Sequence, residues 1–308
     1  MNRRSFAQAL AAGALSAAVP PIRAAATQSA ASAATPAPQY GLSVMLWTVF
    51  HDLPFEERLA KVAEAGYTRI QFVGEYHKWS PADFDRALAA RDRLGMEFDT
   101  TAGLKNTIGD PSQRDALLAE VAHELTLMEK LGCPALIVMS GNVVPGLSRD
   151  AQHESCVEGL KQAAKLVEGR KINGKPIRLL LECIDPHENP KYFLTSAAEG
   201  IEVVREANHP QVRFLYDLFH EQIAEGNLID KLDKHLDVID LIHIADVPGR
   251  HEPGTGEINY GNVYKKLAEL NYRQMIAMEF MPLGDQVAKL KTAKAQAMNP
   301  GTAFGAAI

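Results

Sequence analysis

The chain has 308 residues, 46% of them hydrophobic, which is enough apolar material for one large core of the size of a single α/β barrel. Its formal net charge is −6 and no block of Lys and Arg follows the first few residues. This disfavours a nucleic-acid partner, because such proteins neutralise phosphates with a basic surface. Cys133, Cys156 and Cys183 form no CxxC pair and are odd in number, so we expect buried, reduced thiols.

The N-terminus has the features of a twin-arginine export signal. Arg3 and Arg4 precede a weakly apolar run that ends at Val19, and three alanines after Arg23 supply a cleavage site. The run is too short and too rich in alanine to favour a membrane span. We therefore expect residues 1–26 to be a signal peptide that directs the folded protein to the periplasm. Residues 27–39 are expected to be a disordered Ser/Ala/Pro linker.

From Tyr40 onward, short apolar runs alternate with amphipathic segments. The runs read as strands buried on both faces. The expected strands are Gly41–Phe50, Tyr67–Val73, Glu97–Thr101, Ala135–Ser140, Arg178–Ile184, Val212–Phe219, Val238–Val247 and Met275–Met281. The segments between them have apolar residues three and four apart, as in helices, and two of these end at Gly66 and Gly95. The helix after the sixth strand is the weakest, because Gly226 and Asn227 interrupt it.

Eight strands that are each followed by a helix predict a (β/α)₈ TIM barrel. We expect one domain over residues 40–298, with residues 299–308 as a C-terminal tail. A doubly wound open sheet is the competing fold. It usually has fewer strands and a glycine-rich phosphate loop, and no GxGxxG follows the first strand here.

Four polar residues stand inside apolar runs, one near the C-terminal end of each of the last four strands. They are Glu182, Asp217, His243 and Glu279. Singly, each reads as an ordinary salt-bridged or hydrogen-bonded core residue. Together, strand alternation points all four to the barrel axis and leaves their neighbours facing the helices, namely Cys183, Tyr216, Ile244 and Met278. Burying three carboxylates is costly unless a cation compensates, so we expect a divalent metal site at the barrel mouth.

The ligand set also indicates a chemistry. Mg²⁺ and Mn²⁺ prefer oxygen ligands near octahedral geometry, and one imidazole biases the choice toward Mn²⁺ or Co²⁺. Four protein ligands leave two positions for a hydroxy-carbonyl substrate, whose adjacent oxygens chelate the metal. A polarised carbonyl acidifies the neighbouring C–H, so a carboxylate on each side of the substrate would move a proton between carbons through a cis-enediolate.

The stretches YDLFHEQIAEGNL, HIADVPGRHEPGTGEINY and MEFMP resemble the hydroxypyruvate isomerase family within the xylose-isomerase-like TIM barrels. The resemblance runs from Tyr40 to about Leu290 and implies that hydroxypyruvate is converted to tartronate semialdehyde. It assigns metal binding to the same four residues and proton transfer to Glu182 and Glu279. It also implies that His220 contacts the substrate. The chain departs from typical hydroxypyruvate isomerases in two ways. It has an export leader, and it has His243 at a position where those isomerases usually have Gln and the ketose 3-epimerases have His.

Three further residues are candidates for the substrate pocket. Arg250 is placed to receive a substrate carboxylate or hydroxyl, since a guanidinium binds carboxylates bidentately, and the alternative is a loop salt bridge. Glu188 is a candidate acceptor for a substrate hydroxyl, and Trp47 either walls the pocket or belongs to the core. The expected partner is a small hydroxy-carbonyl or sugar molecule, with no membrane span, and a homo-oligomer is compatible with the sequence.

Several other functions use the same scaffold. A ketose 3-epimerase, or a dehydratase of a sugar or inosose, would use the same metal and glutamate base. A DNA-repair endonuclease would need several more metal ligands and a basic groove. A sugar-binding protein or inactive scaffold would be favoured if either Glu182 or Glu279 were missing, and both are present.

Overall fold

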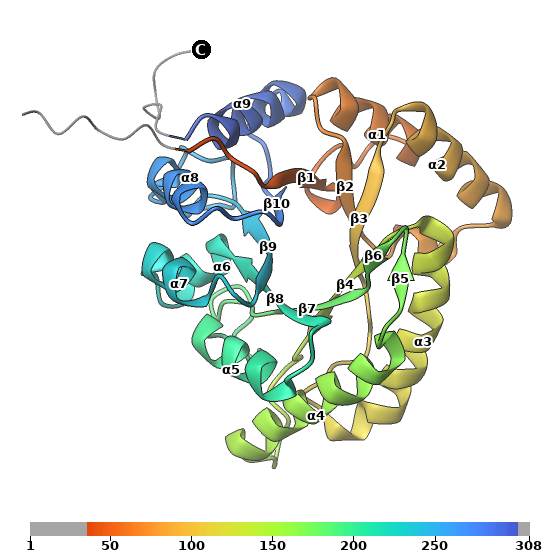
Figure 1. Cartoon of the computed structure of the whole chain (residues 1–308), viewed down its shortest axis with the longest axis vertical. Helices are drawn as coiled ribbons and strands as arrows, with labels where there is room; N and C mark the ends of the chain where they lie inside the picture. Colours follow the sequence, from red (N-terminus) through yellow and green to blue (C-terminus); the bar gives the residue numbers. More distant parts are fainter. Residues whose placement is uncertain (1–35, 301–308) are drawn as a thin grey trace, which may run out of the picture. The chain divides into compact units, whose positions relative to one another are not determined.

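The strands close into a parallel barrel that helices surround. The computed structural model describes residues 36–300, and helices form a ring around the strands in Figure 1. The predicted signal peptide (1–26), the linker up to residue 35 and the tail after residue 300 lie outside the described residues. Within residues 36–300, no helix combines the length and the apolar character needed to cross a membrane.

Eight strands form the barrel, and β10 pairs with β1 to close it. In order around the barrel they are β1 (Gly41–Met45), β2 (Arg69–Val73), β3 (Glu97–Ala102), β4 (Ala135–Met139), β7 (Arg178–Glu182), β8 (Val212–Asp217), β9 (Ile239–Ile244) and β10 (Met275–Met278). Every neighbouring pair is parallel. The predicted TIM barrel is confirmed.

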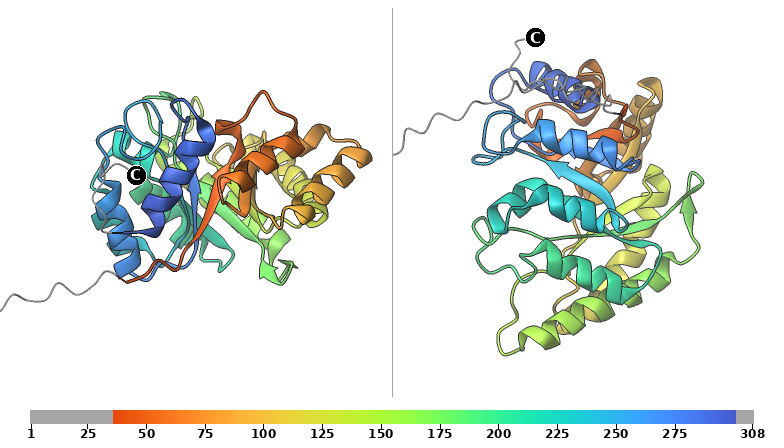
Figure 2. Two further views of the ribbon diagram at one scale, coloured as in Figure 1. Left: turned by 90° about the horizontal axis from the view of Figure 1, so that it is seen from above. Right: turned by 60° about the vertical axis from the view of Figure 1, so that its left-hand side comes forward.

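Helices cover the outer face of the barrel, as the two views of Figure 2 also show. They are α1 (Phe55–Glu64), α2 (Pro81–Arg93), α3 (Arg114–Leu131), α4 (Arg149–Val167), α5 (Ala197–Ala207), α6 (Leu218–Ala224), α7 (Leu228–His235), α8 (Tyr260–Glu269) and α9 (Gln286–Met298), with short 3₁₀ helices at Leu46–Thr48, Glu75–Lys78 and Pro111–Gln113. The expected interruption is confirmed, since Gly226 and Asn227 separate α6 from α7 with φ angles of 67° and 56°.

One element was missed from the sequence. A two-stranded hairpin, β5 (Lys171–Ile172) and β6 (Lys175–Pro176), precedes β7 at the N-terminal end of the barrel. Asn173 and Gly174 form its turn, both with positive φ. An Asn-Gly pair between two short strands is a hairpin signal, so the sequence did contain the information.

The core has two layers. The larger lies between strands and helices and includes Cys183, Tyr216, Ile244 and Met278, which confirms the predicted alternation. The smaller fills the barrel interior with Met45, Ala135, Ile137, Leu180, Leu215, Leu241 and Ala277. All three cysteines are free and buried, as expected.

Several predicted strands are too long at their C-terminal ends. The strand expected over Val212–Phe219 stops at Asp217, because the Asp217 carboxylate caps α6 by accepting a hydrogen bond from the Phe219 amide at 2.8 Å. The first strand stops at Met45, where a 3₁₀ turn begins. Leu46, Phe50 and Phe219 are buried in the turns and helices that follow the strands, so the apolar run continues after strand pairing has ended.

Candidate metal centre

The register of the last four strands brings the four predicted ligands together at the C-terminal mouth of the barrel. Asp217 on β8 pairs directly with His243 on β9, and the amide of Glu279, just after β10, donates to the carbonyl of Ile244. Glu182 ends β7. One ligand atom from each of the four side chains lies within 4.8 Å of the others, and all four residues are at most 7% exposed.

Gln71 on β2 fixes the orientation of the His243 ring. The Gln71 Oε1 atom lies 2.8 Å from His243 Nε2, and both residues are fully buried. The Gln71 Nε2 atom faces the hydroxyl of Thr100 at 3.4 Å, which leaves the carbonyl oxygen for the histidine. Because a carbonyl only accepts, Nε2 carries a proton, and Nδ1 is the nitrogen that faces the carboxylates. Gln71 was not identified from the sequence, where it is one polar residue in an otherwise ordinary strand.

Glu279 is contacted at both of its carboxylate oxygens. Its Oε1 accepts a hydrogen bond from Trp47 Nε1 at 2.6 Å. Its Oε2 lies 2.6 Å from His243 Nδ1 and 2.8 Å from Arg250 Nη2. Burial by itself would raise the pKa of Glu279, but the nearby positive charges of His243 and Arg250 hold that pKa well below its usual range. The carboxylate is therefore ionised at neutral pH.

Glu182 is shifted in the opposite direction. Burial, reinforced by the negative charge of Glu279, raises the pKa of Glu182 to about 7. His243 Nδ1 lies 3.9 Å from Glu182 Oε1. Burial by itself would lower the pKa of His243, but the negative charges of its acidic neighbours, chiefly Glu279, raise that pKa to about 9. The two carboxylates that the family resemblance assigns to proton transfer thus differ in proton affinity, as acid and base partners at one site often do.

Arg250 enters the centre from the loop after β9. Its Nη2 atom lies 3.1 Å from Asp217 Oδ2, and its Nη1 atom lies 3.4 Å from Glu188 and 3.1 Å from His220 Nε2. The guanidinium expected to receive a substrate carboxylate is thus paired with carboxylates of the cluster itself. Its charge offsets part of the repulsion among the three buried acids.

The loop that carries Arg250 is held by Asp246. The Asp246 carboxylate accepts hydrogen bonds from the amides of Val247, Gly254 and Ile258 at 2.8 to 3.0 Å. A Cβ atom on Gly256 would lie only 2.0 Å from the Val247 carbonyl oxygen, so the loop closes only with glycine there. These contacts give a structural role to the VPGRHEPGTGEI stretch, whose pattern carried the family resemblance.

His220 forms a second, adjoining group with Asp185 and Glu188. Asp185 Oδ2 lies 2.6 Å from His220 Nδ1, which directs Nε2 toward Arg250. Burial opposes ionisation of His220, but the charge of Asp217 and the contact with Asp185 leave its pKa raised. Glu188 sits at the edge, with a 43% exposed side chain. Asp185 was missed, although a buried acid three residues after Glu182 was the available signal.

Comparison with known proteins places the fold in a family. A family model described as Xylose isomerase-like TIM barrel matches residues 59–295. The chain belongs to this family. The 2-oxo-tetronate isomerase of Haemophilus influenzae is 31% identical over 254 residues, which cover 80% of this chain and 95% of that protein. The hydroxypyruvate isomerase of Escherichia coli is 26% identical over 250 residues, which cover 78% and 93%.

Two solved structures superpose on the barrel. A Brucella melitensis protein described as an AP endonuclease of family 2 matches with a TM-score of 0.72 and 27% identity, covering 82% of this chain and 96% of that one. The D-psicose 3-epimerase of Clostridium cellulolyticum H10 matches with a TM-score of 0.67 and 18% identity, covering 84% and 96%. The second likeness shows the shared fold and no more.

The residues of this family member fit a divalent cation. His243 Nδ1 and Glu279 Oε2 are both buried, and neither makes a hydrogen bond within the described part of the chain, although they lie 2.6 Å apart. A cation bound to both atoms would take the place of the His243 Nδ1 proton and of the Arg250 contact to Glu279 Oε2. Three carboxylates and the imidazole, neutral once that proton is displaced, are ligands that Mn²⁺ and Mg²⁺ accept. Glu182, Asp217, His243 and Glu279 would hold the ion.

Proposed function

We propose that this protein is a metal-dependent isomerase that moves a proton between neighbouring carbons of a small hydroxy-carbonyl acid. The observation that carries the proposal is the convergence of Glu182, Asp217, His243 and Glu279 from four consecutive strands. Membership of the xylose isomerase-like family and the likeness to curated isomerases support the same reaction class.

The bound metal would polarise the substrate carbonyl and stabilise negative charge on its oxygens. Glu182 and Glu279 are the acid and base. One carboxylate accepts a proton from the carbon that bears the hydroxyl, which leaves the substrate as a cis-enediolate. The opposite glutamate, which holds a proton as a carboxylic acid, donates that proton to the former carbonyl carbon, and a proton moves between the two oxygens, so the substrate keeps its composition and the two glutamates exchange protonation states. The opposite pKa shifts of the two side chains support this division of roles.

The remaining polar groups of the site suit an acidic substrate. Hydroxypyruvate and 2-oxo-tetronate, which name the curated relatives, are both 2-oxo acids with a hydroxyl on the next carbon. Arg250 would exchange its contacts with Asp217 and Glu279 for the substrate carboxylate once a metal neutralises those acids. His220 and Glu188 would contact substrate hydroxyls, and the Trp47 indole would wall the pocket while it holds Glu279. The metal is Mn²⁺ or Mg²⁺, with Co²⁺ as a substitute.

A ketose 3-epimerase is the second candidate. His243 favours it, because the epimerases that this sequence resembles have His at this position and typical hydroxypyruvate isomerases have Gln. Export through the twin-arginine signal of residues 1–26 would place either activity in the periplasm. Export of a folded chain suits an enzyme that acquires its metal in the cytoplasm.

One experiment separates these activities. The Mn²⁺-loaded protein is incubated in D₂O with hydroxypyruvate, 2-oxo-tetronate, ketohexoses or an inosose, and the products are identified by NMR and mass spectrometry. An isomerase incorporates one deuterium and conserves the carbon skeleton of a 2-oxo acid, whereas an epimerase acts on the ketohexoses and a dehydratase loses water. Incision of abasic-site DNA without isomerase activity would support the DNA-repair alternative. Absence of deuterium uptake from every substrate would refute the proposal.

A further inference from the structure

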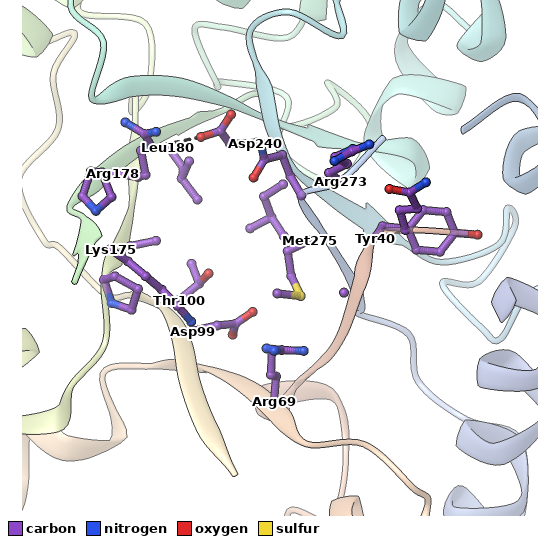
Figure 3. A pocket seen from close by; sticks show the side chains of 17 residues that line it. Tyr40, Arg69, Asp99, Thr100, Lys175, Arg178, Leu180, Asp240, Arg273 and Met275 are labelled. Atoms are coloured by element: carbon purple, nitrogen blue, oxygen red, sulfur yellow. Dashed lines mark ion pairs between the residues drawn. The ribbon is translucent and has the colours of Figure 1, made fainter. Parts of the chain in front are cut away.

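A second pocket lies at the N-terminal end of the barrel, opposite the metal centre. Its volume is about 580 Å³, within the range of small-molecule sites. The beginnings of the barrel strands and the β5–β6 hairpin line it, and Figure 3 looks into it. Its lining includes none of the four residues of the metal cluster. The pocket is therefore not an extension of the proposed active site.

Cationic side chains gather around this pocket although the chain is acidic overall. They are Arg69, Lys175, Arg178 and Arg273. Arg69 and Lys175 share one carboxylate, that of Glu97, at 3.1 and 2.8 Å.

Arg178 likewise shares Asp240 with Arg213, at 3.1 and 2.8 Å. The side chain of Arg273 has no ion pair or hydrogen bond to any described residue. Counting Arg213 and Arg273, five cations meet three carboxylates, those of Glu97, Asp240 and Asp99, and the excess of positive charge favours an anion in the space between.

Asp99 supplies a different kind of contact. It is 7% exposed and lines the pocket, and Figure 3 shows its carboxylate reaching toward the middle from β3. Its Oδ1 accepts a hydrogen bond from the Ser43 hydroxyl at 3.0 Å, but its buried Oδ2 has no hydrogen-bond partner among residues 36–300. A buried carboxylate oxygen without a donor is costly, and a ligand hydroxyl would satisfy it.

We propose that this pocket binds a small organic anion that carries hydroxyl groups. The anionic group lies among Lys175, Arg178 and Arg273, and a hydroxyl donates to Asp99 Oδ2. Leu180 and Met275 pack against the carbon chain of the ligand. The combination of several cations, one buried acceptor and apolar side chains points to an anionic group and hydroxyls carried on one carbon chain.

The test uses the full-length, metal-free protein labelled with ¹³C at the methionine methyl groups. D-gluconate is titrated, with D-glucitol as a probe that has the hydroxyls without the charge and hexanoate as a probe that has the charge without the hydroxyls. Met275 lines the pocket and reports binding there. The Lys175→Gln, Arg273→Gln double variant removes two exposed cations of the site. Lys78→Gln with Arg93→Gln makes the same charge change on exposed residues elsewhere.

We expect a saturable shift of the Met275 methyl signal with gluconate and at least tenfold weaker binding of glucitol and hexanoate. The double variant at the pocket should weaken gluconate binding about tenfold, and the control variant should leave it unchanged, because two partly solvated charge contacts account for about that factor. No saturable shift at Met275, or equal affinity in both double variants, overturns the proposal. The readout does not depend on turnover, so either outcome leaves the proposed isomerase activity to its own test.

Discussion

Replacing Gln71 with Leu tests whether the metal centre depends on the orientation of His243. Leucine has a similar volume but cannot accept the hydrogen bond that Nε2 donates to Gln71 Oε1 over 2.8 Å. The Nε2–H group then stays buried without an acceptor, which costs about 1–3 kcal/mol of unfolding free energy. It also removes the contact that keeps the Nδ1 lone pair facing the carboxylates. Loss of such an outer contact typically weakens metal binding by roughly 10- to 100-fold.

Two measurements check this expectation. Titration calorimetry of Mn²⁺ into the metal-free protein gives the affinity, and ¹⁵N spectra of the histidine side chains report which nitrogen of His243 is protonated. Gln71→Glu keeps an acceptor and should retain the Nε2–H form and most of the affinity. Gln211→Leu is the matched control, because Gln211 is a buried glutamine that donates to the Val167 and Ile177 carbonyls and directly precedes β8, at the end of that strand opposite the metal ligand Asp217.

The control should lose stability without losing metal affinity. A folded Gln71→Leu protein that binds Mn²⁺ within about twofold of the wild type, with an unchanged ¹⁵N pattern, would refute the argument. So would an equal loss of affinity in the Gln211→Leu protein, since a general loss of stability would then explain both.

Three other perturbations have defined outcomes. Glu279→Gln should bind metal weakly and abolish deuterium uptake from D₂O into the substrate; uptake at the wild-type rate would exclude Glu279 from proton transfer. Arg250→Ala should raise KM for 2-oxo acids at least tenfold more than for neutral ketoses, as steady-state kinetics would show, and equal changes would count against carboxylate recognition. Burial raises the pKa of Asp99 from 3.8 to about 7, so the folded protein keeps this proton to higher pH than the unfolded chain. Its contribution to stability is complete below about pH 4 and is lost as the pH rises toward 7. Urea unfolding at several pH values should therefore show that the free energy of unfolding falls less steeply with rising pH in Asp99→Asn than in the wild type. Identical slopes in the two proteins would contradict the raised pKa of Asp99.

The sequence predicted the fold because the periodicity of a TIM barrel is local. Each strand is a short apolar run, and each helix repeats its apolar residues every three or four positions, so both are visible without knowledge of the partner. The same locality identified Glu182, Asp217, His243 and Glu279, because a charged group inside a buried strand conflicts with its surroundings. The strand ends were less well defined, since apolar residues that follow a strand, such as Phe219 in the first turn of α6, are also buried.

Contacts between side chains on distant strands were settled only by the tertiary structure. Gln71 and His243 are 172 residues apart, and no local pattern connects an ordinary glutamine on β2 to a histidine on β9. Asp185, in the loop after β7, meets His220, in α6, although 35 residues separate them in the sequence. The position of Arg250 against Asp217 and Glu279 depends on a loop closed by Asp246 and Gly256. Residue type and periodicity therefore determined which groups face the barrel axis, and the closure of the barrel decided which of them touch, because register and loop path set distances that the order of residues does not contain.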